Sequence, residues 1–250
     1  MNEAFIELRD ITKDFGGVHA LRGVNMQIPE GQVTAIVGDN GAGKSTLISC
    51  LSGLFEPSSG HIFIDGVEVR ITSPIDSRHH GIETVYQDLA LAPDLDAPAN
   101  VFLGREITRL RWLHDTRKMR QLTESRFKEL GVGLVQDMRV PVAAFSGGQK
   151  QSVAIARAAM WAEHVIIMDE PTAALGVVQT ANVLRLIETI RDRGLAVVLI
   201  SHNLPEVLQV ADRIEVMRLG ARVARFRKGE ADAERLIAAM TGSYATEMPA

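Results

Sequence analysis

The sequence predicts an α/β fold with a parallel sheet at its centre. Three short apolar runs, "VTAIVG" (33–38), "VIIMD" (165–169) and "LAVVLIS" (195–201), have the length and composition of strands that helices cover on both faces. Helical patterns lie between these runs, and the alternation of strand and helix is typical of a parallel sheet. A chain of 250 residues is long enough for one large domain, or for one domain with a subdomain.

An antiparallel β subdomain is expected near the start of the chain. The segments "AFIELRDITKDF" and "VNMQIPEG" alternate apolar and polar residues, and "GHIFIDGVEV" does so around a turn at Asp65 and Gly66. Helices are expected over residues 45–52, 149–162 and 178–191.

Residues 88–145 lack a buried-strand pattern and contain loops and amphipathic helices, which predicts a helical insertion. We therefore expect a single domain over residues 1–250. Its nucleotide-binding core and antiparallel β subdomain would take residues 1–87 and 159–240, its helical subdomain 88–158 and a tail 241–250.

Composition excludes several classes of protein. The net charge of −4 gives no reason to expect nucleic acid as a partner. A single cysteine, Cys50, excludes an internal disulfide framework. The first ten residues do not resemble a secretion signal, and no apolar run approaches the roughly 20 residues that span a bilayer. Any association with a membrane is therefore expected to go through a partner.

A phosphate-binding loop follows the first apolar run. Gly38, Gly43, Lys44 and Ser45 match the G-x-x-x-x-G-K-[ST] pattern, between a predicted strand and a predicted helix. Glycines let the backbone curl so that its N–H groups face a phosphate, and the helix adds its positive end. Lys44 can reach the β- and γ-phosphates, and the hydroxyl of Ser45 suits Mg²⁺. A glycine turn without function would leave the lysine unexplained.

Two adjacent carboxylates, Asp169 and Glu170, end the second apolar run. Beside a phosphate loop, Asp169 would hold magnesium, and Glu170 would orient or deprotonate the attacking water. By itself an apolar strand that ends in acids often only exits to solvent, so this assignment depends on the loop.

A second anion site is suggested by "FSGGQKQSVAIARA" (145–158), which offers Ser146 as a helix N-cap and two glycines with free N–H groups. A head-to-tail pair of chains, each covering the nucleotide of the other, would use both sites. An ordinary capped helix remains the alternative for this segment.

The motifs "GDNGAGKST", "FSGGQKQ", "VIIMDEP" and "LISHN", in this order, resemble the ATP-binding subunit of ABC transporters, over nearly the whole chain. The resemblance implies a P-loop NTPase fold with a RecA-like sheet core, ATP and Mg²⁺ as cofactors, and ATPase activity. It implies that Phe15 stacks on adenine, that Gln87 senses magnesium and the γ-phosphate, and that His202 contacts the γ-phosphate. The nucleotide-binding residues are then Phe15, Gly38, Asp39, Asn40, Gly41, Ala42, Gly43, Lys44, Ser45 and Thr46.

The same resemblance assigns the remaining roles. Glu170, His202, Lys44 and Gln87 would serve catalysis, and Ser45, Gln87 and Asp169 would hold the metal. Ser146, Gly147, Gly148 and Gln149 would form the signature motif that closes over the ATP of a second copy.

Within that family, "NVFLGRE" and "EPTAALG" look most like bacterial importers of ribose, xylose and fructose. The resemblance implies a homodimer on the cytoplasmic face of the inner membrane, with permease subunits docked near residues 89–103. A periplasmic sugar-binding protein would be an indirect partner. The sequence does not identify the sugar or the permease. Gly176 departs from the aspartate that most of the wider family has there, which puts the coupling between the two ATP sites in question.

Three alternatives stay open. A branched-chain amino acid importer also carries "FGGVxAL". A soluble ABC-type ATPase that acts on DNA or ribosomes would be expected to show a coiled-coil insertion, tandem halves or a basic surface. A module that binds ATP without hydrolysing it is disfavoured by Glu170 and His202.

Overall fold

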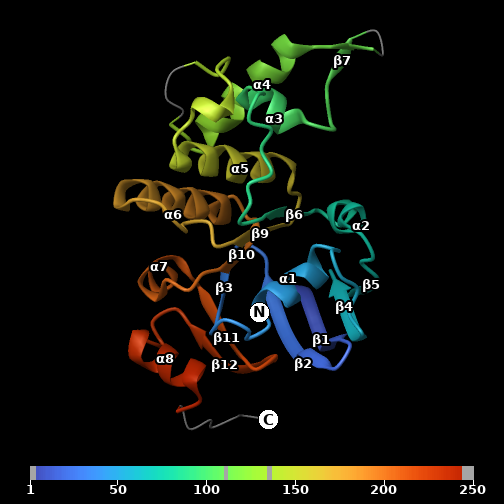
Figure 1. Cartoon of the computed structure of the whole chain (residues 1–250), viewed down its shortest axis with the longest axis vertical. Coiled ribbons are helices and arrows are strands. Elements are labelled where there is room, and N and C mark those ends of the chain that lie inside the picture. Colours follow the sequence, from blue (N-terminus) through green and yellow to red (C-terminus); the bar gives the residue numbers. More distant parts are fainter. Residues whose placement is uncertain (1–3, 110–111, 134–136, 244–250) are drawn as a thin grey trace.

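A mixed sheet forms the centre of the molecule. The computed structural model describes residues 4–109, 112–133 and 137–243. In these ranges, one sheet has six strands in the order β12-β11-β3-β10-β9-β6, and all of its pairs are parallel except β11 with β12 (Figure 1). The strands are β3 (Val33–Val37), β6 (Ile82–Val85), β9 (Val165–Asp169), β10 (Ala196–Ile200), β11 (Arg213–Arg218) and β12 (Ala221–Arg227).

The three strands predicted from apolar runs are β3, β9 and β10, and their parallel pairing is confirmed. Three further strands were not predicted. The segment that forms β6 has only four residues, and those that form β11 and β12 intersperse charged with apolar residues, so neither shows a continuous apolar run.

The antiparallel subdomain is confirmed as a sheet in the order β2-β1-β4-β5. The hairpin between β4 and β5 turns at Asp65 and Gly66, which have φ of 49° and 73°. A two-residue turn with both φ values positive matches the twist of the strands it joins. The strands are β1 (Ala4–Phe15), β2 (Val18–Pro29), β4 (Ser59–Ile64) and β5 (Val67–Val69).

Helices cover both faces of the six-stranded sheet. α1 (Lys44–Leu51) packs between this sheet and the antiparallel sheet, whereas α5 (Gly147–Trp161) and α6 (Val177–Asp192) pack on the other face. Successive residues of one strand point to opposite faces, so Ile167 joins the α1 side of the core and Ile166 the α5 side. At the β11 end the sheet is covered by α7 (Leu204–Val210) and α8 (Ala233–Thr241).

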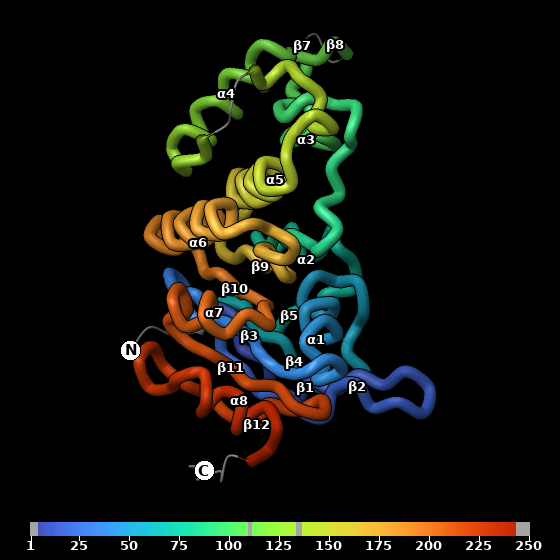
Figure 2. The backbone as a smooth tube through the Cα atoms, turned by 60° about the vertical axis from the view of Figure 1, so that its left-hand side comes forward, coloured from blue at the N-terminus to red at the C-terminus, as the bar shows by residue number. Residues whose placement is uncertain are grey.

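The region between β6 and α5 forms the separate end of the molecule at the top of Figure 1. It contains α3 (Ala97–Phe102), α4 (Thr116–Glu129) and a 3₁₀ turn (Val142–Ala144). Its two short strands, β7 (Thr108–Arg109) and β8 (Leu113–His114), are exposed, so no described strand here is buried, as predicted. The expected boundary at residue 158 falls inside α5, which lies beside α6 in both ribbon views (Figure 2).

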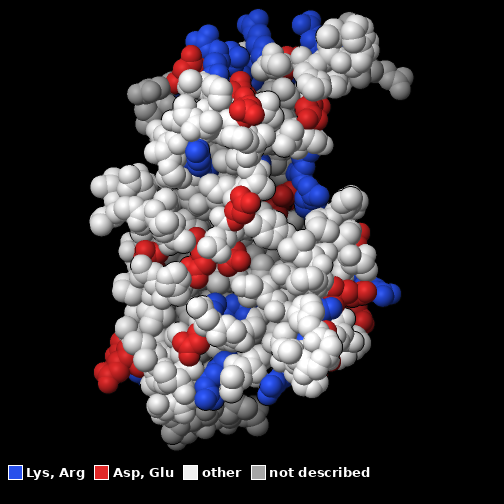
Figure 3. Space-filling model, in the orientation of Figure 1, with Lys and Arg blue, Asp and Glu red and all other residues white. Residues whose placement is uncertain are grey.

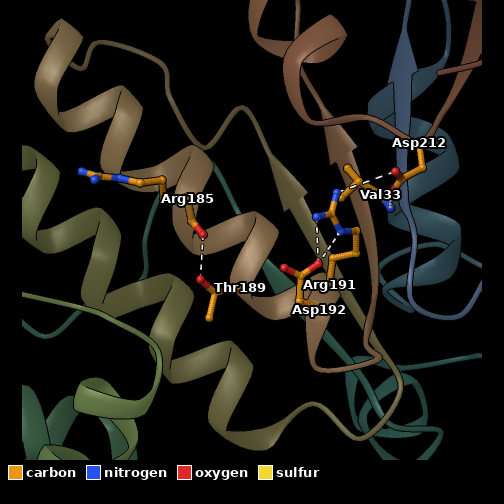
Figure 4. Close-up of polar contacts among 6 residues, drawn as sticks. All are labelled: Val33, Arg185, Thr189, Arg191, Asp192 and Asp212. Carbon is orange, nitrogen blue, oxygen red and sulfur yellow. Dashed lines mark hydrogen bonds and ion pairs between the residues drawn. The ribbon is translucent and has the colours of Figure 1, made fainter. Parts of the chain in front are cut away.

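The carboxyl-terminal end of α6 contacts the amino edge of the sheet through ion pairs (Figure 4). Arg191 forms ion pairs with Asp192 at 2.8 Å and with Asp212 at 3.7 Å, and Asp212 accepts a hydrogen bond of 2.9 Å from the N–H of Val33. A cavity of about 790 Å³ lies at this edge. Ligands of open α/β sheets bind at the carboxyl edge, so we place the functional site at the opposite side.

Candidate active site

The phosphate-binding loop connects β3 to α1 at the carboxyl edge of the sheet. Gly38, Gly41 and Gly43 have φ of 155°, 80° and 99°, a region that favours glycine. A Cβ on Gly38 would lie 2.3 Å from the carbonyl oxygen of Met217, and one on Gly43 would lie 2.8 Å from that of Ala20. The backbone conformation therefore favours glycine at all three positions, and close packing of the loop also requires it at Gly38 and Gly43.

Lys44 starts α1 and is only 8% exposed. Its Nζ donates hydrogen bonds to the carbonyl oxygens of Gly38 at 2.7 Å and of Asp39 at 3.0 Å, so the ammonium spans the loop. Burial lowers the pKa of Lys44, and the negative charges of Glu170 and Asp169 oppose this effect. The structure thus brings the lysine and both predicted carboxylates into one electrostatic cluster.

The turn between β11 and β12 braces the phosphate loop. The N–H of Gly220 donates to the carbonyl of Ala42 at 3.0 Å, and the carbonyl of Gly220 accepts from the N–H of Arg22 at 2.8 Å. A cavity of about 480 Å³ is lined by residues 40–46 together with residues of β2 and of this turn. This turn was not predicted from the sequence, because its role depends on long-range pairing.

Asp169 and Glu170 end β9 beside this loop. Burial raises the pKa of Asp169, and the adjacent negative charge of Glu170 adds to the rise, whereas Lys44 opposes it. Glu170 has φ of 51°, unusual for a residue with a side chain, and its N–H donates to the carbonyl of Ile200 at 3.0 Å. Its carboxylate is directed by this backbone conformation.

His202 lies one residue beyond the buried Ser201, which follows β10. Its Nδ1 is 2.9 Å from Oε2 of Glu170, with side chains that are 73% and 16% exposed respectively. The sequence placed these two residues in one site, and their contact agrees with that placement. The exposed face of His202 is free to meet a ligand from the solvent side.

Gln87 and Phe15 lie at the margins of the site. β6 pairs in parallel with β9 so that Val85 is opposite Met168, which places Gln87 and Glu170 just beyond the same sheet edge. Phe15 is 41% exposed and makes an edge-to-face contact with Phe55 at 5.2 Å between ring centroids. Nζ of Lys13 lies 5.2 Å from the Phe15 ring. Phe15 therefore keeps part of its surface open to solvent, and Phe55 is a neighbour that sequence reasoning missed.

The signature residues start α5. Ser146 is the N-cap, and it forms a capping box with Gln149: Oγ of Ser146 accepts from the N–H of Gln149 at 3.3 Å, and Oε1 of Gln149 accepts from the N–H of Ser146 at 2.8 Å. The predicted N-cap is confirmed. Among the described residues that line the cavity at the phosphate loop, none belongs to the signature.

Gly176 is the N-cap of α6 and offers no side-chain cap. Gln179 fills the space beside it: a Cβ on Gly176 would lie 2.8 Å from Oε1 of Gln179, and a Cβ on Gly148 would lie 2.5 Å from Cγ of Gln179. The loop after Glu170 and the signature are therefore packed together inside one chain through Gln179.

The α/β fold and its glycine-rich loop define a P-loop nucleotide-binding protein, with two adjacent carboxylates beside the loop. The family model described as ABC transporter matches residues 21–173, and the chain belongs to this family. It is an ATP-binding protein of the family and an ATPase.

The chain is 43% identical to a fructose import ATP-binding protein of Rhizobium meliloti, over 96% of this chain and 95% of that protein. It is 44% identical to a xylose/arabinose import ATP-binding protein of Sulfolobus acidocaldarius, over 94% and 93%. A ribose import ATP-binding protein of Bacillus subtilis is 38% identical over 97% of this chain but only 49% of its own length.

Solved structures agree with the fold. A nucleotide-free ATP-binding cassette from an ABC transporter has a TM-score of 0.81 at 26% identity and covers 91% of this chain and 92% of its own. A dimeric cassette in a post-hydrolysis state, bound to ADP and Pi, has a TM-score of 0.74 at 26% identity, over 89% and 98%.

Proposed function

We propose that this chain hydrolyses MgATP to power the import of a sugar through a membrane permease. The observation that carries the proposal is the cluster of Lys44, Asp169 and Glu170 at the carboxyl edge of the sheet, with His202 2.9 Å from Glu170. The sugar import proteins among its relatives support the substrate class. They favour this class over the branched-chain amino acid alternative.

Each residue of the cluster has a task that fits its chemistry. Backbone N–H groups of the loop and Lys44 would hold the phosphates, and Phe15 would stack on adenine. Glu170 would accept a proton from the water whose oxygen attacks the γ-phosphorus, while the bond to the ADP oxygen breaks. His202 would contact the γ-phosphate and orient Glu170.

Magnesium suits the donors at this site. Ser45, Asp169 and Gln87 offer hard oxygen atoms. Burial raises the pKa of Asp169 and the negative charge of Glu170 adds to the rise, and a bound cation would offset both effects. The ion would neutralise charge on the phosphates.

A second copy of the chain would complete each ATP site. The signature at Ser146 begins α5, which packs on the face of the sheet opposite α1, and cassettes of known structure include dimers. ATP that bridges one chain's phosphate loop and the partner's signature would favour the closed pair, and hydrolysis would release it.

The permease would dock in a cavity of about 330 Å³ between the core and the helical subdomain. Arg105 crosses this cavity, pairing with Glu83 at 2.6 Å and lying 4.8 Å from the ring of Trp161. Leu54 and Leu103 line it and are 50% and 52% exposed. This mixture of apolar and charged groups fits a short amphipathic segment of a partner.

Such docking would place the chain on the cytoplasmic face of the membrane, with a periplasmic sugar-binding protein as an indirect partner. Among the described helices, none combines the length and hydropathy needed to cross a bilayer. In Figure 3 basic side chains gather at the upper end of the molecule, whereas acidic and basic side chains are interspersed over the lower part of this face. The lower part therefore shows no continuous basic surface of the kind expected for a DNA-binding ATPase.

The proposal is tested by uptake. Vesicles that carry this chain with a permease and a binding protein of a sugar import system are supplied with ATP and with labelled fructose, xylose, arabinose, ribose or leucine. We expect uptake of one sugar, none of leucine, and none with Glu170→Gln. Uptake of leucine alone would instead support the amino acid alternative.

A further inference from the structure

Glu206 connects the two loops that carry Glu170 and His202. It lies in the first turn of α7, and its carboxylate accepts two hydrogen bonds. Oγ1 of Thr172 donates to Oε2 of Glu206, and Nδ2 of Asn203 donates to Oε1 at 2.6 Å. Both oxygens of this carboxylate are therefore engaged by loop side chains.

The two donors stand next to the residues proposed for catalysis. Thr172 follows Glu170 by two positions and is 9% exposed, and Asn203 directly follows His202. The N–H of Asn203 also donates to Oγ of the buried Ser201 at 3.1 Å. A shift of either loop against the other would change the contact of 2.9 Å between His202 and Glu170.

The loop at Glu170 needs such support. Glu170 and Ala174 have φ of 51° and 60°, and residues with side chains keep such conformations only when surrounding contacts hold them. The N–H of Glu170 has one such contact, to the carbonyl of Ile200. The bond from Thr172 to Glu206 connects the same turn to α7.

We propose that Glu206 is a positioning residue for ATP hydrolysis, which holds Glu170 and His202 in register by joining Thr172 to Asn203. Both oxygens of the Glu206 carboxylate are engaged by Thr172 and Asn203, so it acts through these two residues rather than on the nucleotide. The proposal rests on the roles given to Glu170 and His202 above.

The competing explanation is that Glu206 only stabilises α7, since an acid in the first turn favours a helix. The chain offers a matched control. Glu234 is also an acid in a first turn, that of α8, and it is exposed. Glu234→Ala removes the same helix effect far from the catalytic loops.

The variants are chosen to separate hydrogen bonding from charge. Glu206→Ala removes both contacts. Glu206→Gln keeps both, because its amide oxygen can accept from Asn203 while its N–H donates to the hydroxyl of Thr172, which can also accept. Thr172→Val removes one contact without changing the size of the side chain.

The experiment measures kcat, the dissociation constant for ATP and the thermal midpoint of the purified full chain. We expect Glu206→Ala to lower kcat about tenfold and to leave ATP affinity within about twofold, since only orientation is lost. Glu206→Gln is expected to restore most of kcat. Thr172→Val should lower kcat, and the double variant with Glu206→Ala should lose less than the product of the two effects, because both remove the same link.

An unchanged kcat in Glu206→Ala, or a loss equal to that of Glu234→Ala, would overturn the proposal. So would a Glu206→Gln variant as impaired as Glu206→Ala. Glu170→Gln, assayed in parallel, tests the role of Glu170 separately from that of Glu206. If it hydrolyses ATP normally, the role of Glu170 fails, whereas its inactivity beside a silent Glu206→Ala removes only the role of Glu206.

Discussion

The phosphate loop and the helical subdomain are held in place by different kinds of contact. Around the loop, contacts from distant segments join backbone to backbone: the N–H of Gly220 to the carbonyl of Ala42, and the N–H of Glu170 to the carbonyl of Ile200. The Lys44 side chain adds bonds only within the loop itself. In the helical subdomain, side chains reach to backbone. Asn100, which is fully buried, donates to the carbonyls of Ala92, Leu95 and Asp96.

The contacts between the core and the helical subdomain are also hydrogen bonds from side chains to backbone carbonyls. Arg157 donates to the carbonyls of Leu89 and Ala90, both at 2.9 Å, and Nε1 of Trp161 donates to the carbonyl of Val101 at 2.9 Å. Backbone hydrogen bonds hold the core together, whereas a few side-chain hydrogen bonds set the orientation of the helical subdomain relative to it. We therefore expect substitutions in the core to change chemistry and those in the helical subdomain to change communication between sites.

The largest expected effect is that of Glu170→Gln in the core. Loss of the proton acceptor should lower kcat by about 100-fold or more, as is typical for a general base. ATP binding should remain, and the ATP-bound dimer should accumulate in size-exclusion chromatography. Normal turnover would contradict the role given to Glu170.

Gly148→Ala tests the helical subdomain, at the signature. The added Cβ would lie 2.5 Å from Cγ and 2.8 Å from Cβ of Gln179, so the signature must shift against α6. We expect hydrolysis by the dimer to fall roughly tenfold, with ATP affinity of the single chain unchanged. The companion Gly148→Ala/Gln179→Gly should recover activity, because it removes both obstructing atoms, Cβ and Cγ of Gln179, and leaves Cα at 3.9 Å; if it does not, the clash is not the cause.

Glu215→Gln probes the core without touching chemistry. Glu215 in β11 is fully buried, with Arg225 at 2.6 Å and Arg222 at 3.6 Å, and burial raises its pKa above the ordinary 4.5. The folded chain then binds this proton at a higher pH than the unfolded chain. Wild-type stability should consequently gain a contribution as pH falls from the raised pKa toward 4.5, and lose it as pH rises.

Denaturant unfolding of wild type and Glu215→Gln at several pH values measures this contribution. We expect the stability difference between them to vary with pH in that sense and the ATPase activity to stay unchanged. A difference that does not vary with pH would show that Glu215 keeps an ordinary pKa.

The smallest expected effect is that of Gly176→Asp. The backbone there, with φ of −76° and ψ of 166°, suits a capping aspartate, and the added side chain meets only the flexible end of Gln179. Replacing glycine at an N-cap by aspartate gains a few tenths of a kcal/mol. We expect ATP affinity to stay the same and the Hill coefficient of hydrolysis to change. Loss of ATP binding would mean that this loop is misplaced.

The sequence predicted the features that depend on neighbours along the chain. The phosphate loop, the apolar strands and the N-cap at Ser146 each occupy one contiguous segment whose residues must cooperate locally. β6 was not predicted, because a strand of four residues is too short to show a clear hydrophobic pattern. Phe15, Gln87 and His202 were assigned only from the resemblance to the transporter family, and their roles remain proposals.

What the sequence did not predict depends on distant partners. The brace of Gly220 on Ala42 and the link of Glu206 to Thr172 join segments that are brought together only when the sheet forms. The residues around Gly220 and Glu206 in the sequence do not indicate which distant residue each one contacts. The packing of Gln179 against Gly148 is of the same kind.

The 15-residue α5 crosses from the signature to the cavity proposed for the permease. A helix of that length extends about 22 Å and bends little. Ser146 stands at one end, and Arg157 and Trp161 stand near the other. Such a rod works as a lever: a tilt imposed at the signature by a second nucleotide would swing the docking end, and a load on the permease would press back on the signature. Transport and hydrolysis would then be coupled to each other in both directions.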